Sequence, residues 1–360
     1  MKVLILGGYG NFGKRIAGLL TRKGIAVIIA GRDGAKATGL AKALPPGLAD
    51  VAVFDAKSDL LPQLTKLKSP IVINTCGPFQ NANYSIARAC IAACVHYIDL
   101  ADGRDFVTGI TQLDADAKKR NVAVISGAST VPGLSSAVVE NFLPEFSAIE
   151  SLTFGITPGQ RAERGLATTQ GILSYVGRKL KPCPGYTTRY GWQDVYLQPY
   201  PEIGRRWMAN CDIPDLDLLP ERYGIKRIRF SAGMELSIIH FGLWLLSWGV
   251  RLGLPVNLTK HAPALLEASH WFDLIGSADG GMHVILKGED RSGRPVIKKW
   301  FIIARDGDGP YIPTIPAVVL AAKIIDGSFV RVGAMPCVGM ITLQEYLDEL
   351  SRLKIKAYAP

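Results

Sequence analysis

Residues 2–13 read KVLILGGYGNFG and place a glycine-rich turn directly after a short apolar run. Consecutive apolar residues without alternation are typical of a strand buried on both faces of a parallel sheet. In the G-x-G-x-x-G spacing, the first glycine allows a tight turn and the second lets the backbone approach a pyrophosphate. The third lets the following helix pack close to the sheet, and the N-terminus of that helix attracts an anion. We therefore expect this turn to bind a dinucleotide through Gly8, Tyr9, Gly10, Asn11, Phe12 and Gly13.

The rest of the first 145 residues repeats the same alternation of apolar runs and helical spacing. The further apolar runs are AVIIA (26–30), VAVFD (51–55), IVINT (71–75), HYIDL (96–100) and VAVIS (122–126). Helical spacing occupies residues 11–23, 34–43, 58–67, 82–94 and 105–120. Strands that are each followed by a helix predict an α/β domain with a doubly wound parallel sheet of the Rossmann type.

The pattern changes after about residue 146. The strand-like runs there are SLTFGI (151–156), IRFSAG (228–233), HVILKG (283–288) and KKWFIIA (298–304), with helical stretches and Pro-rich connections around 182–220 between them. This mixture predicts an α+β domain on an antiparallel or mixed sheet. From Ile315 to Ile355 the spacing is helical again, with Thr342 as a cap. We expect two domains, residues 1–145 with 310–360 and residues 146–309, with the C-terminal helices returning to the Rossmann domain.

The end of the second strand distinguishes the two nicotinamide cofactors. An NAD-binding domain usually has an acidic residue there that accepts a hydrogen bond from the ribose 2′-hydroxyl. This chain has Arg32 at that position, after Gly31, and a guanidinium can hold a 2′-phosphate with two hydrogen bonds. Asp33 follows, and either contacts the ribose itself or caps the next helix. The sequence favours NADP over NAD, with Lys36 as a second positive charge.

Further cofactor contacts are expected where other strands end. Thr75, Cys76, Gly77, Pro78 and Phe79 follow the fourth run, at the carboxyl edge where ligands bind in such sheets. Cys76 and Phe79 are expected beside the nicotinamide or its ribose, unless the segment is only a rigid turn. Asp55 ends the third run and either approaches the adenine side or caps the helix that follows.

Composition limits the kinds of partner and the cellular compartment that we expect. The formal charge is +10, but the basic residues are dispersed among acidic ones, so we expect no nucleic acid and a small-molecule substrate. No signal peptide is apparent and the cysteines show no C-x-x-C pair, so we expect a cytoplasmic protein. Leu236–Val250 is almost wholly apolar but shorter than a spanning helix. It is either a buried core helix, the lining of a lipid-sized pocket, or a helix at a membrane surface, which would make the protein peripherally membrane-associated.

The N-terminal third resembles the saccharopine dehydrogenase-like oxidoreductases. The resemblance rests on GGYGNFGKRIA (7–17), AGRD (30–33), NTCGPFQNANYSIARACIAACVHYIDLADGRDF (74–106) and VISGASTVPGLSSAVV (124–139). Three later stretches are similar to an uncharacterised bacterial and lipid-associated branch: RAERGLATTQGILSYVGR (161–178), GGMHVILKGED (280–290) and GPYIPTIPAVVLAAKI (309–324). The resemblance implies an NADP-binding oxidoreductase that forms a homodimer, with an inserted α+β domain that binds substrate and mediates dimerisation. Where lysine-pathway members have Gly-x-Asp-Pro-Gly, this chain has Ser129–Gly133 without the acid, which argues against saccharopine as substrate.

Candidate groups for the chemistry are few, because hydride transfer belongs to the cofactor. Asp102 and Tyr97 lie at or just past the fifth run, and Asp102 is the leading candidate for handling a proton unless it caps the helix that begins near Arg104. Arg161, Arg164 and His283 are candidates for binding substrate, against the alternatives of surface ion pairs for the arginines and a buried structural role for the histidine. No metal site is expected. The sequence thus predicts an NADP-dependent oxidoreductase acting on an amino-acid, imine or carbonyl-type substrate; the alternatives are a lipid- or membrane-associated enoyl-type reductase and an NADPH-binding module without turnover.

Overall fold

All six apolar runs of the N-terminal third form parallel strands in the computed structural model, which describes residues 1–58, 60–80 and 82–360. The strands are β1 (Lys2–Leu6), β2 (Ala26–Gly31), β3 (Ala49–Val53), β4 (Ile71–Asn74), β5 (His96–Asp99) and β6 (Ala123–Ser126). They lie in the order β6-β5-β4-β1-β2-β3, so the strand order reverses between β1 and β4. Such a switch point is where doubly wound sheets bind their ligands, and the predicted Rossmann fold is confirmed.

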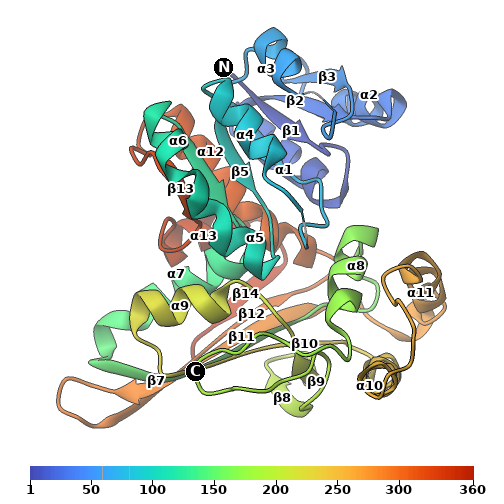
Figure 1. Ribbon diagram of the computed structural model, residues 1–360, viewed down its shortest axis with the longest axis vertical. Coiled ribbons are helices and arrows are strands. Elements are labelled where there is room, and N and C mark those ends of the chain that lie inside the picture. The colour runs from blue at the N-terminus through green and yellow to red at the C-terminus, as the bar shows by residue number, and fades with distance from the viewer. Residues whose placement is uncertain (59, 81) are drawn as a thin grey trace. The chain divides into compact units, whose positions relative to one another are not determined.

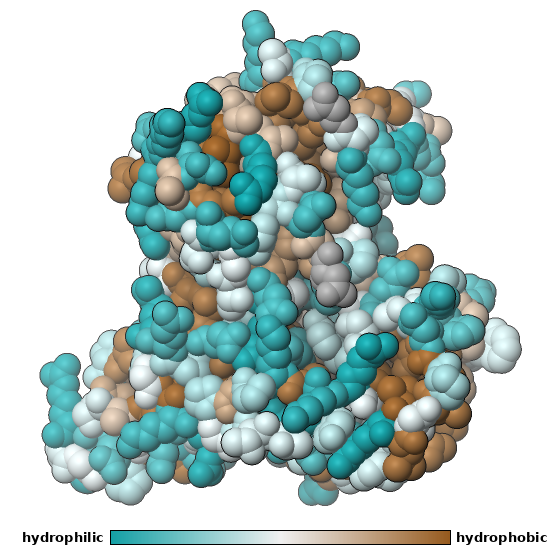
Figure 2. Space-filling model, viewed as in Figure 1, coloured by the Kyte–Doolittle hydropathy of each residue, from teal (hydrophilic) through white to brown (hydrophobic). Residues whose placement is uncertain are grey.

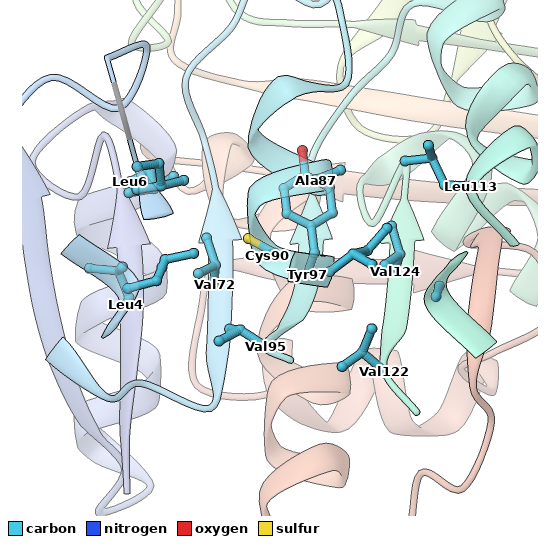
Figure 3. Packing of buried hydrophobic residues seen from close by; sticks show 14 of the residues in the cluster. Leu4, Leu6, Val72, Ala87, Cys90, Val95, Tyr97, Leu113, Val122 and Val124 are labelled. Carbon is cyan, nitrogen blue, oxygen red and sulfur yellow. The ribbon is translucent and has the colours of Figure 1, made fainter. Parts of the chain in front are cut away.

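Helices cover this sheet (Figure 1). They are α1 (Asn11–Arg22), α2 (Gly34–Ala43), α3 (Leu61–Leu67), α4 (Ser85–Ala92), α5 (Arg104–Thr108), α6 (Asp114–Lys119) and α12 (Ile315–Ile325). The helix predicted over 105–120 is divided into α5 and α6 by a 3-10 turn that begins at Gly109. Figure 3 shows the core on one side of the sheet, where Leu4 of β1, Val72 of β4 and Val124 of β6 lie with Tyr97 of β5 and with Cys90. The packing of these apolar side chains holds the strands in place, and with them the edge of the sheet at which their carboxyl ends lie.

A seventh strand completes this sheet and was not predicted. The strand β13 (Gly333–Pro336) pairs in parallel with β6, in a region where the spacing had indicated only helices. Its four residues, GAMP, contain a glycine and a proline and no apolar run, so nothing in the local pattern marks a strand. Contacts with β6 and with the Asp114 side chain, which accepts a hydrogen bond from Ala334 N at 3.0 Å, hold it there.

The second sheet contains both parallel and antiparallel strands. It comprises β7 (Ala148–Thr157), β8 (Tyr196–Tyr200), β9 (Gly204–Asn210), β10 (Arg227–Gly233), β11 (Gly280–Glu289), β12 (Pro295–Ala304) and β14 (Ile355–Tyr358), in the order β14-β12-β11-β7-β10-β9-β8. Only β7 and β10 run parallel, so the predicted α+β domain with a mixed sheet is confirmed. The sheet curls, so that Glu202 between β8 and β9 accepts a hydrogen bond from Arg305 Nε, beyond β12, at 2.9 Å.

The helices that accompany the second sheet are α7 (Ser135–Phe142), α8 (Leu166–Tyr175), α9 (Asp215–Tyr223), α10 (Ser237–Arg251), α11 (Ala262–His270) and α13 (Leu343–Leu350). Contacts divide the chain into one unit of Met1–Leu134 with Tyr311–Ile341 and another of Ser135–Pro310 with Thr342–Pro360. This division differs from our predicted boundaries at 135–145, at Pro310 and at 342–360, so of the C-terminal helices α12 lies in the first unit and α13 in the second. The predicted cap at the start of α13 is present, because Glu345 N donates to Thr342 Oγ1 at 3.2 Å.

Helix α10 is not the buried core helix that its composition favoured. Of its residues only His240 and Ser247 are buried, and both are polar. No helix in the described residues has the length and hydropathy needed to cross a bilayer. An apolar composition therefore gave the helix but not its environment, because composition alone does not show which side of a helix contacts the protein.

Candidate cofactor site

The glycine-rich turn lies between β1 and α1, at the switch point of the first sheet. Gly8 N donates to Ala30 O at 3.1 Å and Gly10 N donates to Gly7 O at 2.8 Å, which close the turn against β2. The helix α1 begins at Asn11, and its N-cap Gly10 is extended and has no capping side chain. A helix N-terminus without a capping side chain leaves room for an anion at its positive end, so the turn fits a pyrophosphate.

The third glycine packs α1 against the turn. A Cβ on Gly13 would lie 2.4 Å from Gly7 O and 2.7 Å from Gly8 Cα, far inside contact distance. Gly7 has φ +71°, which a residue with a side chain rarely adopts, and a Cβ there would meet Thr75 Oγ1 at 2.8 Å. Thr75 Oγ1 in turn donates to Leu6 O at 2.8 Å. Two predicted segments, the turn and the end of β4, are therefore joined.

Arg32 and Asp33 have different roles at the end of β2. The Asp33 side chain accepts a hydrogen bond from Lys36 N at 3.0 Å as the N-cap of α2, and this bond lowers the pKa of its carboxyl. Of the two alternatives for Asp33, the structure therefore shows the cap. Arg32 is exposed and makes no hydrogen bond or ion pair with any residue that the structure describes. Its guanidinium is accordingly available to an anionic group at this edge.

Tyr9 covers the end of β2 next to Arg32. The hydroxyl of Tyr9 accepts a hydrogen bond from Asp33 N at 3.0 Å. Its ring lies against Gly31, where a Cβ would approach Tyr9 Cε1 to 2.3 Å. A glycine is thus required at position 31 by the ring of Tyr9, a contact that the sequence alone does not indicate.

Asp55 forms a turn after β3. Its Oδ1 accepts a hydrogen bond from Lys57 N at 2.9 Å, and its carbonyl oxygen accepts one from Ser58 Oγ at 2.6 Å. Asp55 stays exposed. The expectation that it approaches the adenine side of a cofactor remains a prediction.

The segment after β4 places its side chains differently. Cys76 is half-buried, and burial raises the pKa of its thiol to about 11. Phe79 is buried and packs on Phe106, with ring centroids 5.4 Å apart. Gly77 and Pro78 complete the turn. Cys76 keeps some access to the edge of the sheet, whereas Phe79 belongs to an aromatic cluster beneath it.

A buried polar cluster supports the same edge. Tyr97 is buried, and its hydroxyl accepts a hydrogen bond from Asn74 Nδ2 at 3.1 Å, while Asn74 Oδ1 accepts one from Cys76 N at 3.0 Å. Burial raises the pKa of Tyr97 well above its usual value. A tyrosine in this position orients Asn74 and does not itself reach a substrate. Asn74 was not predicted as a site residue, although its position as the polar end of the otherwise apolar strand β4 was a signal for it.

Asp99 is the second member of this cluster. Its Oδ1 accepts hydrogen bonds from Ala101 N at 3.0 Å, Ser126 Oγ at 2.9 Å and Gly127 N at 2.8 Å. Burial raises the pKa of its carboxyl from 3.8 to about 6, against the lowering effect of these bonds. Asp99 therefore ties the loops after β5 and β6 together.

Asp102 differs from these buried groups, because its side chain is exposed. Its Oδ1 accepts a hydrogen bond from Gln80 Nε2 at 3.0 Å, so the carboxylate is held by the loop after β4. The structure thus brings Asp102 to the carboxyl edge of the first sheet, where it can exchange protons with solvent or a ligand.

The candidate substrate residues of the second unit fall into three environments. Arg161 is exposed. Arg164 Nη2 donates to Asp273 Oδ1 at 3.1 Å, so its charge is paired within the unit. His283 is buried inside the curled sheet, where its Nδ1 lies 2.7 Å from the hydroxyl of Tyr200. Burial lowers the pKa of His283 to about 3, which keeps the ring neutral.

Comparisons with known proteins agree with this architecture. Residues 3–127 match the family model described as the saccharopine dehydrogenase NADP binding domain. The chain is similar to the saccharopine dehydrogenase (L-Glu forming) of Saccharomyces cerevisiae, with a TM-score of 0.66 and 13% identity over 100% of this chain and 99% of that one. It is also similar to an amine dehydrogenase of Mycobacterium smegmatis, with a TM-score of 0.48 and 11% identity over 94% of both chains. No curated protein matches the sequence. At these identities the yeast structure shows a common fold for the whole chain.

Proposed function

We propose that the chain is an oxidoreductase that uses NADP in preference to NAD, on the premise that residues 3–127 match the saccharopine dehydrogenase NADP binding domain. The observation that supports this preference is that Asp33 and Arg32, neighbours at the end of β2, have different roles. Asp33, the alternative acceptor for a ribose 2′-hydroxyl, caps α2, whereas Arg32 beside it is exposed and has no partner among the described residues. A 2′-phosphate supplies the counter-charge that this guanidinium lacks.

The remaining residues fit a bound nicotinamide dinucleotide. The N-terminus of α1 and Gly8, Gly10 and Gly13 would hold the pyrophosphate, while Thr75 and Cys76 line the edge beyond it. The cofactor supplies the hydride acceptor or donor. Asp102 would give or take the accompanying proton, because it is an exposed carboxylate that Gln80 orients.

The proposed substrate class rests on the arginines of the second unit. Arg164 is engaged by Asp273, so Arg161 is the better candidate for holding a substrate carboxylate. We therefore propose a small amino-acid, imine or carbonyl-type substrate. His283 contributes to the packing of the second sheet rather than to binding, since its ring is buried between Tyr196 and Tyr200.

The cofactor preference is tested by titrating NADPH and NADH into the wild-type protein and into Arg32→Ala. Two hydrogen bonds to a charged phosphate are worth about 2–3 kcal/mol, so we expect Arg32→Ala to bind NADPH roughly 30- to 150-fold more weakly. Its affinity for NADH should change little. Arg120→Ala is the matched control, because Arg120 is also exposed but lies at the end of α6. Equal losses for both cofactors, or none for NADPH, would show that Arg32 does not read the 2′-phosphate.

A panel of amino acids, imines, carbonyl compounds and enoyl compounds then tests turnover. Oxidation of NADPH with a carboxylate-bearing substrate supports the proposed class if Arg161→Ala raises the KM for that substrate. Tight NADPH binding without turnover of any compound in the panel would favour a binding module that only senses the cofactor.

A further inference from the structure

Helix α10 is apolar on two sides: Leu243, Trp244, Leu246 and Val250 pack against a core cluster of this unit, whereas a second apolar side is exposed. Its exposed side follows Ile238, Gly242, Leu245 and Leu252, a spacing that places them on one stripe of the helix and its end. Ile238, Leu245 and Leu252 are 62%, 67% and 81% exposed. A surface helix usually turns such a stripe toward the core. Here these three side chains stay exposed instead.

The polar side of α10 holds the helix in this rotation. Gln193 Nε2 donates to Ser247 Oγ at 3.4 Å, and Arg251 Nη1 donates to Gln193 Oε1 at 2.6 Å. At the other end Trp192 Nε1 donates to the carbonyl oxygen of His240 at 3.0 Å, and both residues are buried. Because these partners lie beneath the helix, the apolar stripe faces outward as part of the folded unit.

Neighbouring segments enlarge the stripe. Leu254 follows α10, and Trp271, Leu274 and Ile275 follow α11 with exposures of 76%, 95% and 69%. We call these four, together with Ile238, Leu245 and Leu252, the apolar patch. Figure 2 shows hydrophobic residues gathered over α10 and α11 on the visible face. An exposed apolar surface of this extent marks a site of interaction with another apolar surface.

The charges around the patch indicate which surface it meets. From Leu236 to Leu266 the chain contains no aspartate or glutamate, whereas Arg251 and Lys260 are exposed there. Beyond it lie Glu267, which is exposed on α11, and Asp273, which pairs with Arg164 and His270. In a two-fold dimer through this patch, Arg251 and Lys260 would approach their own copies with fewer unpaired carboxylates than cations. An anionic lipid surface instead supplies both the apolar layer and the negative charge, and exposed tryptophan is favoured at that boundary.

We propose that the apolar patch docks on the surface of an anionic lipid bilayer, with α10 lying along the interface and not crossing it. The exposed leucines, isoleucines and Trp271 would enter the boundary between headgroups and acyl chains. Arg251 and Lys260 would contact the headgroups. The unit thereby acquires an attachment to membranes that is independent of its cofactor chemistry.

The test is co-sedimentation of the full chain with vesicles of phosphatidylcholine, with and without phosphatidylserine. We expect binding to the anionic vesicles that weakens with salt. The double variant Leu245→Glu/Leu274→Glu should bind at least tenfold more weakly, since each buried leucine contributes roughly a tenfold factor. Lys260→Glu should weaken binding by up to roughly fivefold for each unit of charge changed, because a basic residue near an anionic surface contributes about 1 kcal/mol. Val330→Glu is the matched control, because Val330 is 81% exposed and lies in the other unit.

A second readout separates insertion from charge attraction alone. Trp271 emission should shift to shorter wavelength with anionic vesicles, and the shift should be largely lost in Trp271→Phe. NADPH affinity and thermal midpoint measure folding, and both should be unchanged in every variant. Vesicle binding that the leucine variants leave intact would overturn the proposal. So would a wild-type dimer that these variants dissociate while no form binds vesicles, because the patch would then be an interface between two copies.

Discussion

Replacing Asp99 with asparagine tests the buried cluster beneath the candidate site through its effect on stability at different pH values. Burial raises the pKa of Asp99 from 3.8 to about 6. Between these values the folded state keeps a proton that the unfolded state has released, so the stability of the wild-type protein falls as pH rises through this window. At 1.36 kcal/mol for each pKa unit, a shift of about two units amounts to about 3 kcal/mol.

In Asp99→Asn the side chain cannot ionise, but its amide oxygen can still accept from Ala101, Ser126 and Gly127. We therefore expect the variant to match the wild type near pH 4 and to exceed it by up to about 3 kcal/mol near pH 8. Urea unfolding across this range, followed by fluorescence and circular dichroism, measures the difference. Asp116→Asn, with a 65% exposed side chain, should leave the profile unchanged. A difference between Asp99→Asn and wild type that does not grow with pH would refute the assigned burial and ionisation of Asp99.

Three further predictions concern the cofactor edge. Gly13→Ala places a Cβ 2.4 Å from Gly7 O, so it should cost about 1–3 kcal/mol of stability and weaken NADPH binding at least tenfold, as measured by thermal melting with and without NADPH. Asp33→Ala removes the cap of α2 and should cost about 1 kcal/mol, while the ratio of NADPH to NADH affinity is preserved; a selective loss of NADH binding would instead assign Asp33 to the ribose. Asp102→Asn should lower kcat roughly 100-fold or more and remove a basic limb from the pH–rate profile, with NADPH affinity unchanged in a direct titration. If the pH profile keeps its shape, Asp102 does not handle the proton.

The first sheet was predictable because each of its signals is local. Continuous Val and Ile runs such as Val27–Ala30 require two buried faces, and the spacing from Gly8 to Gly13 has one steric explanation, which the Gly13 contacts confirm. The strands β8 and β9 were missed, because Tyr196–Tyr200 and Gly204–Asn210 contain a proline or adjacent arginines and look like connections. Their pairing depends on residues distant in sequence, which a local pattern does not show.

The site was predictable to a smaller extent. Residue type and position pointed to Arg32, Asp33 and Thr75, but only the coordinates show that Asp33 caps a helix and that Thr75 bonds Leu6. Tyr97 has the residue type of a proton donor, yet its side chain packs inward from β5. The side on which a strand residue lies follows from the register, and a shift of one position exchanges the two faces. For α10 the exposed stripe likewise depends on which partners fix the rotation of the helix.

The central claim is that Arg32 and its surroundings bind a 2′-phosphate, and fragments of the cofactor test it without the nicotinamide half. Calorimetric titration of the wild-type protein with 2′,5′-ADP and with 5′-AMP compares two ligands that differ only in this phosphate. We predict that 2′,5′-ADP binds at least about tenfold more tightly, with an advantage that salt weakens, because the contact is between charged groups. Equal affinity for the two nucleotides would contradict the assignment of Arg32 and the preference for NADP.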